Sequence, residues 1–278
     1  MASTWIEEIR NQLPPRLMLM NLGLANGQFP RTLYKYTTTD TLKLILENAT
    51  LKYSKISEFN DKKECFAILD FQCTPDEWYQ YVNGINPEMP QAFVKKMARD
   101  LQQSPELGKQ WITKAIKDTN EHLGILCLTG SNQNELMWAH YADSHRGVCL
   151  EFDLGKSIDT FCFPKKVEYS DVTKRYNYIR SWVERKGMDA TEAIYHKSSK
   201  WEYEEEYRVV RVDGAGFIPF NKESLCSICF GIDTPEETIK EIITLCFDKG
   251  YDHIRFLRNT LDDESGEYRI VSINCTRN

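Results

Sequence analysis

Residues 32–57 decide the fold, and they read TLYKYTTTDTLKLILENATLKYSKIS. The run Thr32–Thr37 is rich in aromatic and β-branched side chains, which favours a strand. The residues that follow place three apolar side chains on one face of a helix: Leu42, Ile45 and Leu46. Leu51–Ser57 is again extended in character. This order of strand, helix and strand predicts an α+β core.

Later segments continue the mixture of strands and helices. Residues 124–129 and 147–152 have the apolar or alternating pattern of strands. Apolar stripes indicate a helical insertion at about 75–120. The strands and helices do not follow the regular spacing of a doubly wound sheet. We therefore expect the α+β fold class, with a single mixed or antiparallel sheet core, surrounding helices and this insertion.

The N-terminal segment, residues 1–30, has a different character. Trp5–Leu13 has the pattern of a short amphipathic helix, Pro14-Pro15 breaks it, and an irregular connector runs to Pro30. The sequence thus predicts an N-terminal helical appendage, followed by a single α+β domain over residues 31–278.

Composition and charge restrict the kinds of partner. The chain has 278 residues, of which 41% are hydrophobic, and this is enough for a real core. Asp and Glu number 41 against 35 Lys and Arg, so the formal net charge is −6. Such a chain has no net attraction for a phosphate backbone or an anionic membrane surface. We expect a small-molecule ligand, and a protein or nucleic-acid target stays open.

The cysteines and the N-terminal sequence indicate the cellular compartment of the protein. The nine cysteines are odd in number and mostly lie in apolar runs, which favours a reducing compartment. The first residues lack a basic region followed by an apolar stretch, and no window reaches the roughly 20 apolar residues of a membrane span. We therefore expect a cytoplasmic protein without a membrane partner.

One cysteine pair has metal-site spacing. Cys226-Ser-Ile-Cys229 matches a zinc or redox pair, but the sequence holds no second pair. The letters Ile-Cys-Phe around Cys229 read as a buried strand. The sequence therefore predicts no metal at this pair.

A first group of candidate site residues lies within Met137–His145. If this segment is helical, His140 and Tyr141 share one side with Met137. Imidazole and phenol groups serve as hydrogen-bond donors and as acid/base groups, so this side can line a pocket. The alternative is a core helix in which the polar atoms of the Trp, Tyr and His side chains form hydrogen bonds within the protein.

A second group lies within Lys197–Arg208. If the chain is extended from about Tyr203, then Glu204, Glu206 and Arg208 point to one face. At the surface, such a Glu–Arg pair contributes little. In a cleft, the same pair gives an oriented carboxylate that acts as a general base or stabilises positive charge.

A third group combines an aromatic strand with a turn. Tyr34, Lys35 and Tyr36 lie in the first predicted strand. Asn60 and Asp61 follow Phe59 in the turn after the second predicted strand. Aromatic strands are usually core and Asn-Asp usually forms a turn, so a ligand role for these residues competes with a structural one.

The three groups, taken in this order, resemble a bacterial family known as domain of unknown function 2971. The matching motifs are Leu33–Tyr36, Phe59–Asp61, Met137–Ala142 with Gly147–Phe152, and Lys197–Arg208. The resemblance covers roughly residues 31–275. The family has no assigned reaction, so the resemblance implies site positions rather than a function.

The order of elements also looks like that of ADP-ribosyltransferases. These enzymes carry an Arg or His on the first strand, a Ser, Thr or Tyr on a middle strand, and a Glu late in the chain. Thr129 and Glu206 or Glu204 fit the last two positions, whereas the first strand offers Tyr34, Lys35 or Tyr36 instead of Arg or His. The resemblance implies an NAD-using enzyme, of the kind found among toxin or antiphage effectors.

This resemblance implies a role for each candidate residue. The catalytic set is Glu206, Glu204, His140, Tyr141 and Arg208. The set that binds NAD, as a substrate, is Tyr34, Lys35, Tyr36, Asn60, Asp61, Thr129, Trp138, Lys197 and Trp201. Cleavage of the nicotinamide bond develops positive charge on the ribose, which a carboxylate stabilises while aromatic rings hold the nicotinamide.

Two other functions remain open. The first is a metal-dependent nuclease that uses Asp61, Glu204 and Glu206 as Mg²⁺ ligands. The second is a binding module without catalysis, in which the Trp, His and Tyr side chains line a pocket for a ligand or peptide.

Overall fold

The computed structural model describes residues 13–61, 64–65, 68–172, 175–184 and 192–275. The chain divides into two compact units. Unit 1 comprises residues 1–54, 124–167 and 200–278, and unit 2 comprises residues 55–123 and 168–199. A single domain over residues 31–278 stays a prediction.

An eight-stranded sheet forms the centre of unit 1. Its order is β14-β13-β12-β5-β1-β4-β10-β6. The strands are β1 (Thr32–Thr37), β4 (Gly124–Thr129), β5 (Val148–Asp153), β6 (Lys165–Lys166), β10 (Glu206–Arg211), β12 (Leu225–Phe230), β13 (Arg255–Leu261) and β14 (Tyr268–Ser272). Only β12 and β13 pair in parallel among these strands, and the other neighbours pair antiparallel. The predicted α+β class with a mixed sheet is confirmed.

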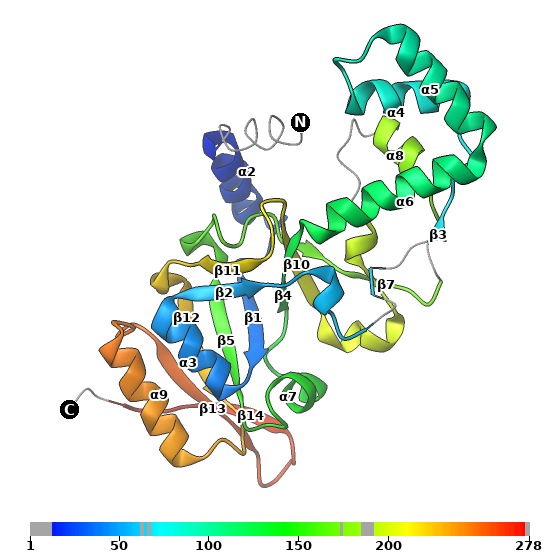
Figure 1. Ribbon diagram of the computed structural model, residues 1–278. Coiled ribbons are helices and arrows are strands. Elements are labelled where there is room, and N and C mark those ends of the chain that lie inside the picture. The colour runs from blue at the N-terminus through cyan, green and yellow to red at the C-terminus, as the bar shows by residue number, and fades with distance from the viewer. Residues whose placement is uncertain (1–12, 62–63, 66–67, 173–174, 185–191, 276–278) are drawn as a thin grey trace. The chain divides into compact units, whose positions relative to one another are not determined.

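Two helices cover one face of this sheet. Helix α3 (Thr39–Asn48) connects β1 to the next strand, and α9 (Glu236–Asp248) connects β12 to β13 (Figure 1). The apolar stripe of α3, Leu42, Ile45 and Leu46, is buried as predicted, and these side chains belong to the main core with Leu33 and Phe152. Thr38 caps α3 by accepting a hydrogen bond from the Thr41 amide. The side chains that alternate with this core along the strands project from the opposite face of the sheet.

Smaller elements complete unit 1. Strands β2 (Thr50–Tyr53) and β11 (Gly216–Pro219) form a two-stranded sheet. Helix α7 (Glu135–Tyr141) precedes β5, and short 3-10 helices lie at η2 (Leu154–Lys156), η4 (Ser199–Glu204) and η5 (Lys222–Ser224).

The N-terminal segment differs from the prediction. A helix, α2, runs over Leu13–Ala25, where an irregular connector was expected. Prolines are compatible with the first turn of a helix, because the amide protons that they lack have no partner within the helix there. Pro14-Pro15 therefore fits within the described start of this helix. The expected helix over Trp5–Leu13 lies, apart from Leu13, outside the described residues.

Unit 2 is mainly helical and contains the predicted insertion. Its helices are α4 (Pro75–Ile85), α5 (Gln91–Gln103), α6 (Pro105–Glu121) and α8 (Tyr178–Glu184) (Figure 1). Tyr81 makes edge-to-face contacts with Trp78, Trp111, Tyr178 and Trp182 at the centre of their core. Its short elements are η1 (Ile56–Glu58), β3 (Ile68–Leu69), β7 (Glu168–Tyr169), β8 (Arg175–Tyr176), η3 (Glu192–Tyr195) and β9 (His196–Lys197).

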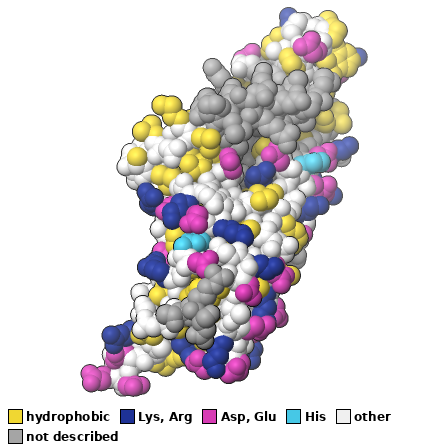
Figure 2. Space-filling model, turned by 90° about the vertical axis from the view of Figure 1, so that its left-hand side faces the viewer, with side chains coloured by type: hydrophobic (Ala, Val, Ile, Leu, Met, Phe, Trp, Pro, Cys, Tyr) yellow, Lys and Arg dark blue, Asp and Glu magenta, His cyan; other side chains and the backbone are white. Residues whose placement is uncertain are grey.

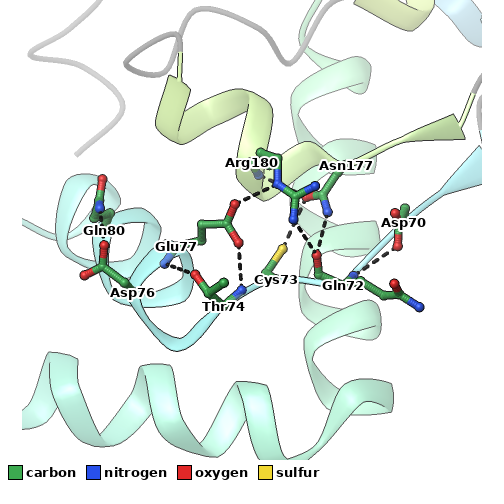
Figure 3. Close-up of polar contacts among 9 residues, drawn as sticks. All are labelled: Asp70, Gln72, Cys73, Thr74, Asp76, Glu77, Gln80, Asn177 and Arg180. Carbon is green, nitrogen blue, oxygen red and sulfur yellow. Dashed lines mark hydrogen bonds and ion pairs between the residues drawn. The ribbon is translucent and has the colours of Figure 1, made fainter.

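A polar clamp joins the two chain segments of unit 2 (Figure 3). Arg180 donates to Glu77 at 2.7 Å and to the Gln72 carbonyl at 3.1 Å. Asn177 donates to the same carbonyl at 3.0 Å. Glu77 also accepts from the Thr74 amide, which closes the capping box of α4. Each side chain of the clamp therefore serves the local structure of unit 2.

Candidate functional site

Helix α7 lies beside the segment that leads into β10. The Tyr141 hydroxyl donates to Glu204 Oε1 at 2.5 Å, and Asn134 Nδ2 donates to the Tyr203 carbonyl at 2.9 Å. The Tyr203 hydroxyl and His140 Nδ1 are 3.2 Å apart. The predicted proximity of the Met137 helix and the Glu204 segment is confirmed, although the partners are 63 or 69 residues apart in sequence.

Helix α7 ends earlier than predicted. It stops at Tyr141, and the next residues include three successive non-glycine residues with positive φ: Asp143 at 47°, Ser144 at 51° and His145 at 66°. Such a left-handed run costs about 1–2 kcal/mol per residue. It brings Gly147 so close to Thr37 that an added Cβ would lie 2.4 Å from the Thr37 carbonyl oxygen. The turn therefore fixes where β5 begins, next to β1.

The sheet register brings polar side chains from six strands into one row. Glu206 on β10 is opposite Thr129 on β4, which is opposite Tyr34 on β1. Tyr34 is in turn opposite Glu151 on β5. The row continues through Ser227 on β12 to Arg255 on β13. Side chains of directly opposed residues project from the same face, so we name these six residues the polar row.

The members of the polar row differ in exposure. The side chains of Glu206, Glu151 and Arg255 are 6%, 19% and 64% exposed. Tyr34 is half-buried, whereas Thr129 is buried and accepts a hydrogen bond from the Ser131 amide. A ligand would therefore approach from the end of the row with Tyr34, Glu151 and Arg255.

Glu206 is oriented by a buried ion pair. Arg208, which is fully buried, donates from Nε and Nη2 to the two carboxylate oxygens, both at 2.8 Å. Burial lowers the pKa of the Arg208 guanidinium to about 9, which leaves it protonated at neutral pH. The bidentate geometry fixes the direction of the carboxylate.

Glu204 belongs to the 3-10 helix η4 and not to the strand in which it was predicted. The extended segment begins at Glu206 and not at Tyr203, because η4 continues to Glu204 and Glu205 has a positive φ of 44°. Glu204 is buried beside Tyr141 instead of standing on the strand face.

Three members of the polar row were not among the predicted residues. Glu151 accepts from Ser227 Oγ at 2.5 Å and from Arg255 Nη2 at 2.8 Å. Burial raises the pKa of the Tyr34 phenol, and the nearby Glu151 raises it further, so the phenol remains a donor at neutral pH. A carboxylate within the apolar run Val148–Phe152 was the sequence signal for this part of the site.

The neighbouring positions on this face are core. Trp138 is fully buried and packs edge-on against Tyr36, with ring centroids 5.1 Å apart. Its indole N–H donates to the Asn132 carbonyl at 3.1 Å. The Tyr36 hydroxyl is buried and has no hydrogen-bond partner among the described residues. In contrast, Trp201 is half-buried and contacts Tyr203.

The remaining predicted ligand residues are distributed differently. Lys35 projects its ammonium to the Cys127 carbonyl, 3.2 Å away. Asn60, Asp61 and Lys197 belong to unit 2. There, Asn60 Oδ1 accepts from the Asp61 amide at 3.0 Å, and Lys197 forms a buried ion pair with Glu64 at 3.3 Å. The structure thus gathers in unit 1 the predicted catalytic residues and the aromatic ones.

The described part of the chain contains no cluster of three or more His, Cys, Asp or Glu side chains able to hold a metal ion. Cys226 lies at an irregularity of β12 between Leu225 and Ser227, and Cys229 is buried on the strand. The carboxylates of Glu204 and Glu206 are directed to Tyr141 and Arg208, respectively.

The distribution of surface charge and the length of the helices are relevant to nucleic-acid and membrane partners. On the face drawn in Figure 2, acidic and basic side chains are interspersed, and no region of one sign dominates it. Among the described residues, no helix has the length and apolar character needed to cross a bilayer.

Unit 1 is an α+β unit, and the polar row on one face of its sheet is the candidate site. Residues 137–209 match the model of a family described as Protein of unknown function (DUF2971). This match confirms the resemblance from the sequence over the range from α7 into β10. No curated protein and no solved structure matches the chain.

Proposed function

We propose that the chain cleaves the nicotinamide–ribose bond of NAD and transfers ADP-ribose to an acceptor. The observation that carries the proposal is the alignment of Tyr34, Thr129 and Glu206 by strand register, in the order β1, β4, β10. An aromatic ring, a hydroxyl and a carboxylate on adjacent strands are the groups that this chemistry requires.

The proposed reaction assigns each group a task. The bond between the ribose C1′ and the nicotinamide nitrogen breaks, and its electron pair leaves with the nicotinamide. The ribose then carries positive charge, which the Glu206 carboxylate stabilises. A nucleophile of the acceptor forms the new bond at C1′ and loses its proton. The half-buried Tyr34 ring packs against the nicotinamide, and Thr129 orients the ribose.

The exposed end of the row supports this assignment. Arg255 is 64% exposed and paired with Glu151. A guanidinium is suited to bind phosphate oxygens in pairs, so Arg255 is the group that we assign to the diphosphate of NAD. Tyr34 lies opposite Glu151 on the neighbouring strand, between this diphosphate position and Glu206.

A binding module without catalysis is the second candidate. It is favoured by the Glu206–Arg208 pair, because a positive partner at 2.8 Å offsets the charge that Glu206 would offer to the ribose. In that case, the polar row binds a small molecule and leaves it unchanged.

The test is incubation of the purified full-length chain with NAD, followed by chromatography for free nicotinamide. The proposal expects nicotinamide to accumulate in proportion to the amount of enzyme. Retention of intact NAD would favour the binding module. Mg²⁺-dependent cleavage of RNA or DNA without NAD would favour a nuclease, and both outcomes contradict the proposal.

A further inference from the structure

A cavity lies on the α3 side of the sheet in unit 1. Its volume is about 380 Å³, and residues of β1, α3, β2 and β11 line it. The strands β1 and β2 meet β4 at different places, since β1 pairs at Thr129 and Ser54 pairs with Ile125. Between these two places, the Cys127 carbonyl accepts from Lys35 Nζ at 3.2 Å. Lys35 therefore sits where the strands diverge.

The lining contains large apolar side chains that no other part of the described chain covers completely. Leu44 is 58% exposed and Phe217 is 69% exposed, and Ile45 is buried beneath them in the core. Exposed apolar groups around a concave surface of this size are typical of a ligand site. The apolar part of a ligand would be in contact with Leu44 and Phe217.

The charged groups of the lining have one sign. Lys35 and Lys52 line the cavity, and the other lining residues include no carboxylate. An ammonium group has three protons to donate, and burial lowers the pKa of Lys35. Lys35 is half-buried, and the Glu206 carboxylate raises its pKa. A bound anion would add negative charge beside this ammonium on the cavity side.

We propose that this cavity binds a small amphipathic carboxylate, with its carboxylate at Lys35 and Lys52 and its apolar chain against Leu44 and Phe217. Lys35 follows Tyr34 of the polar row in sequence, but alternation along β1 directs the two side chains to opposite faces of the sheet. The proposed binding does not depend on NAD cleavage. Amphipathic carboxylic acids are thus a second class of ligand for unit 1.

Calorimetric titration of the full-length chain with octanoate tests the proposal, with octanol and octylamine as matched probes. Octanoate should bind at least about tenfold more tightly than octanol, because the alcohol lacks the charged hydrogen bonds to lysine. Octylamine should not bind. Each CH₂ added from hexanoate to octanoate should tighten binding about fourfold, the factor that corresponds to about 0.8 kcal/mol.

Substitutions locate the site. Leu44→Glu places a negative charge in the lining and should weaken octanoate binding about tenfold, whereas Leu44→Lys should not weaken it; position 44 is exposed on α3, so both variants keep the fold. Lys35→Met should abolish binding, and Lys240→Met on α9 is the control that leaves it unchanged. Absence of octanoate binding to the wild-type chain, equal binding of octanol, or equal binding to both Leu44 variants would overturn the proposal.

Discussion

Each unit contains a carboxylate held by an arginine, and the two pairs differ in burial and in neighbours. Glu206 and Arg208 in unit 1 have side chains that are 6% and 0% exposed. Glu77 and Arg180 in unit 2 have side chains that are 17% and 47% exposed. Glu77 caps a helix and Arg180 binds a carbonyl of the same clamp. Glu206, by contrast, belongs to a row of polar groups that crosses six strands.

The difference shows how a structural pair can be told from a candidate site. The clamp of unit 2 has a structural role, because it joins two chain segments that are far apart in sequence. The polar row joins strands that backbone hydrogen bonds already hold together, so its side chains are not needed for that purpose. Burying charged groups without such a need costs free energy, which is why we assign the function to the polar row.

The largest expected stability effect is at Arg208. Arg208→Met removes the guanidinium that pairs with the buried Glu206 and should lower the free energy of unfolding by about 3–5 kcal/mol. The matched control is Arg180→Met in the clamp, whose arginine is far more exposed and should contribute much less. Urea denaturation followed by circular dichroism measures the free energy of unfolding of both variants. Equal decreases in the two variants would contradict the difference between the two pairs.

A smaller effect is expected at the contact between α7 and Glu204. Tyr141→Phe removes the hydroxyl that donates to Glu204 at 2.5 Å and should lower the free energy of unfolding by about 1–3 kcal/mol, since the bond involves a charged acceptor. Tyr79→Phe in unit 2, where the hydroxyl donates to Gln91 on the surface, is the control. A stability of Tyr141→Phe equal to wild type would show that this contact does not hold α7 in place.

The smallest effect concerns the clamp at acid pH. The hydrogen bond from Arg180, followed by those from Thr74, holds the pKa of Glu77 below its usual value. A carboxyl group with a lowered pKa stabilises the fold fully above its unfolded pKa of about 4.3, and this contribution is lost as the pH falls through the lower folded pKa. Wild type should therefore lose slightly more stability than Glu77→Gln between pH 5 and pH 3, measured by thermal melting. Parallel pH profiles would remove Glu77 as the titrating group.

Local patterns in the sequence were sufficient to predict most of the sheet. The strand over residues 124–129 was predicted with the same bounds that the structure gives β4, and the stripe of α3 is buried as expected. These predictions depend only on side-chain periodicity within one segment. The exception is α2, because an irregular connector was predicted where Leu13–Ala25 is helical.

The site could be predicted only in part. Glu206 and Tyr34 were found from their own segments, but their alignment through Thr129 depends on the register of strands far apart in sequence, which no local pattern specifies. Glu151 was missed because an acidic residue in an alternating strand also fits a solvent-facing position. Glu204 was misplaced because the left-handed conformation of Glu205 interrupts the expected strand.

The central claim is that the polar row, and Glu206 in particular, carries catalysis. The direct measurement is the rate of nicotinamide release from NAD by wild type, Glu206→Gln and Glu77→Gln, at a temperature where melting curves show all three folded. Both substitutions replace an arginine-paired carboxylate with an amide of the same shape. We predict that Glu206→Gln lowers the rate about a hundredfold or more and that Glu77→Gln retains the wild-type rate. Full activity of folded Glu206→Gln would contradict the account.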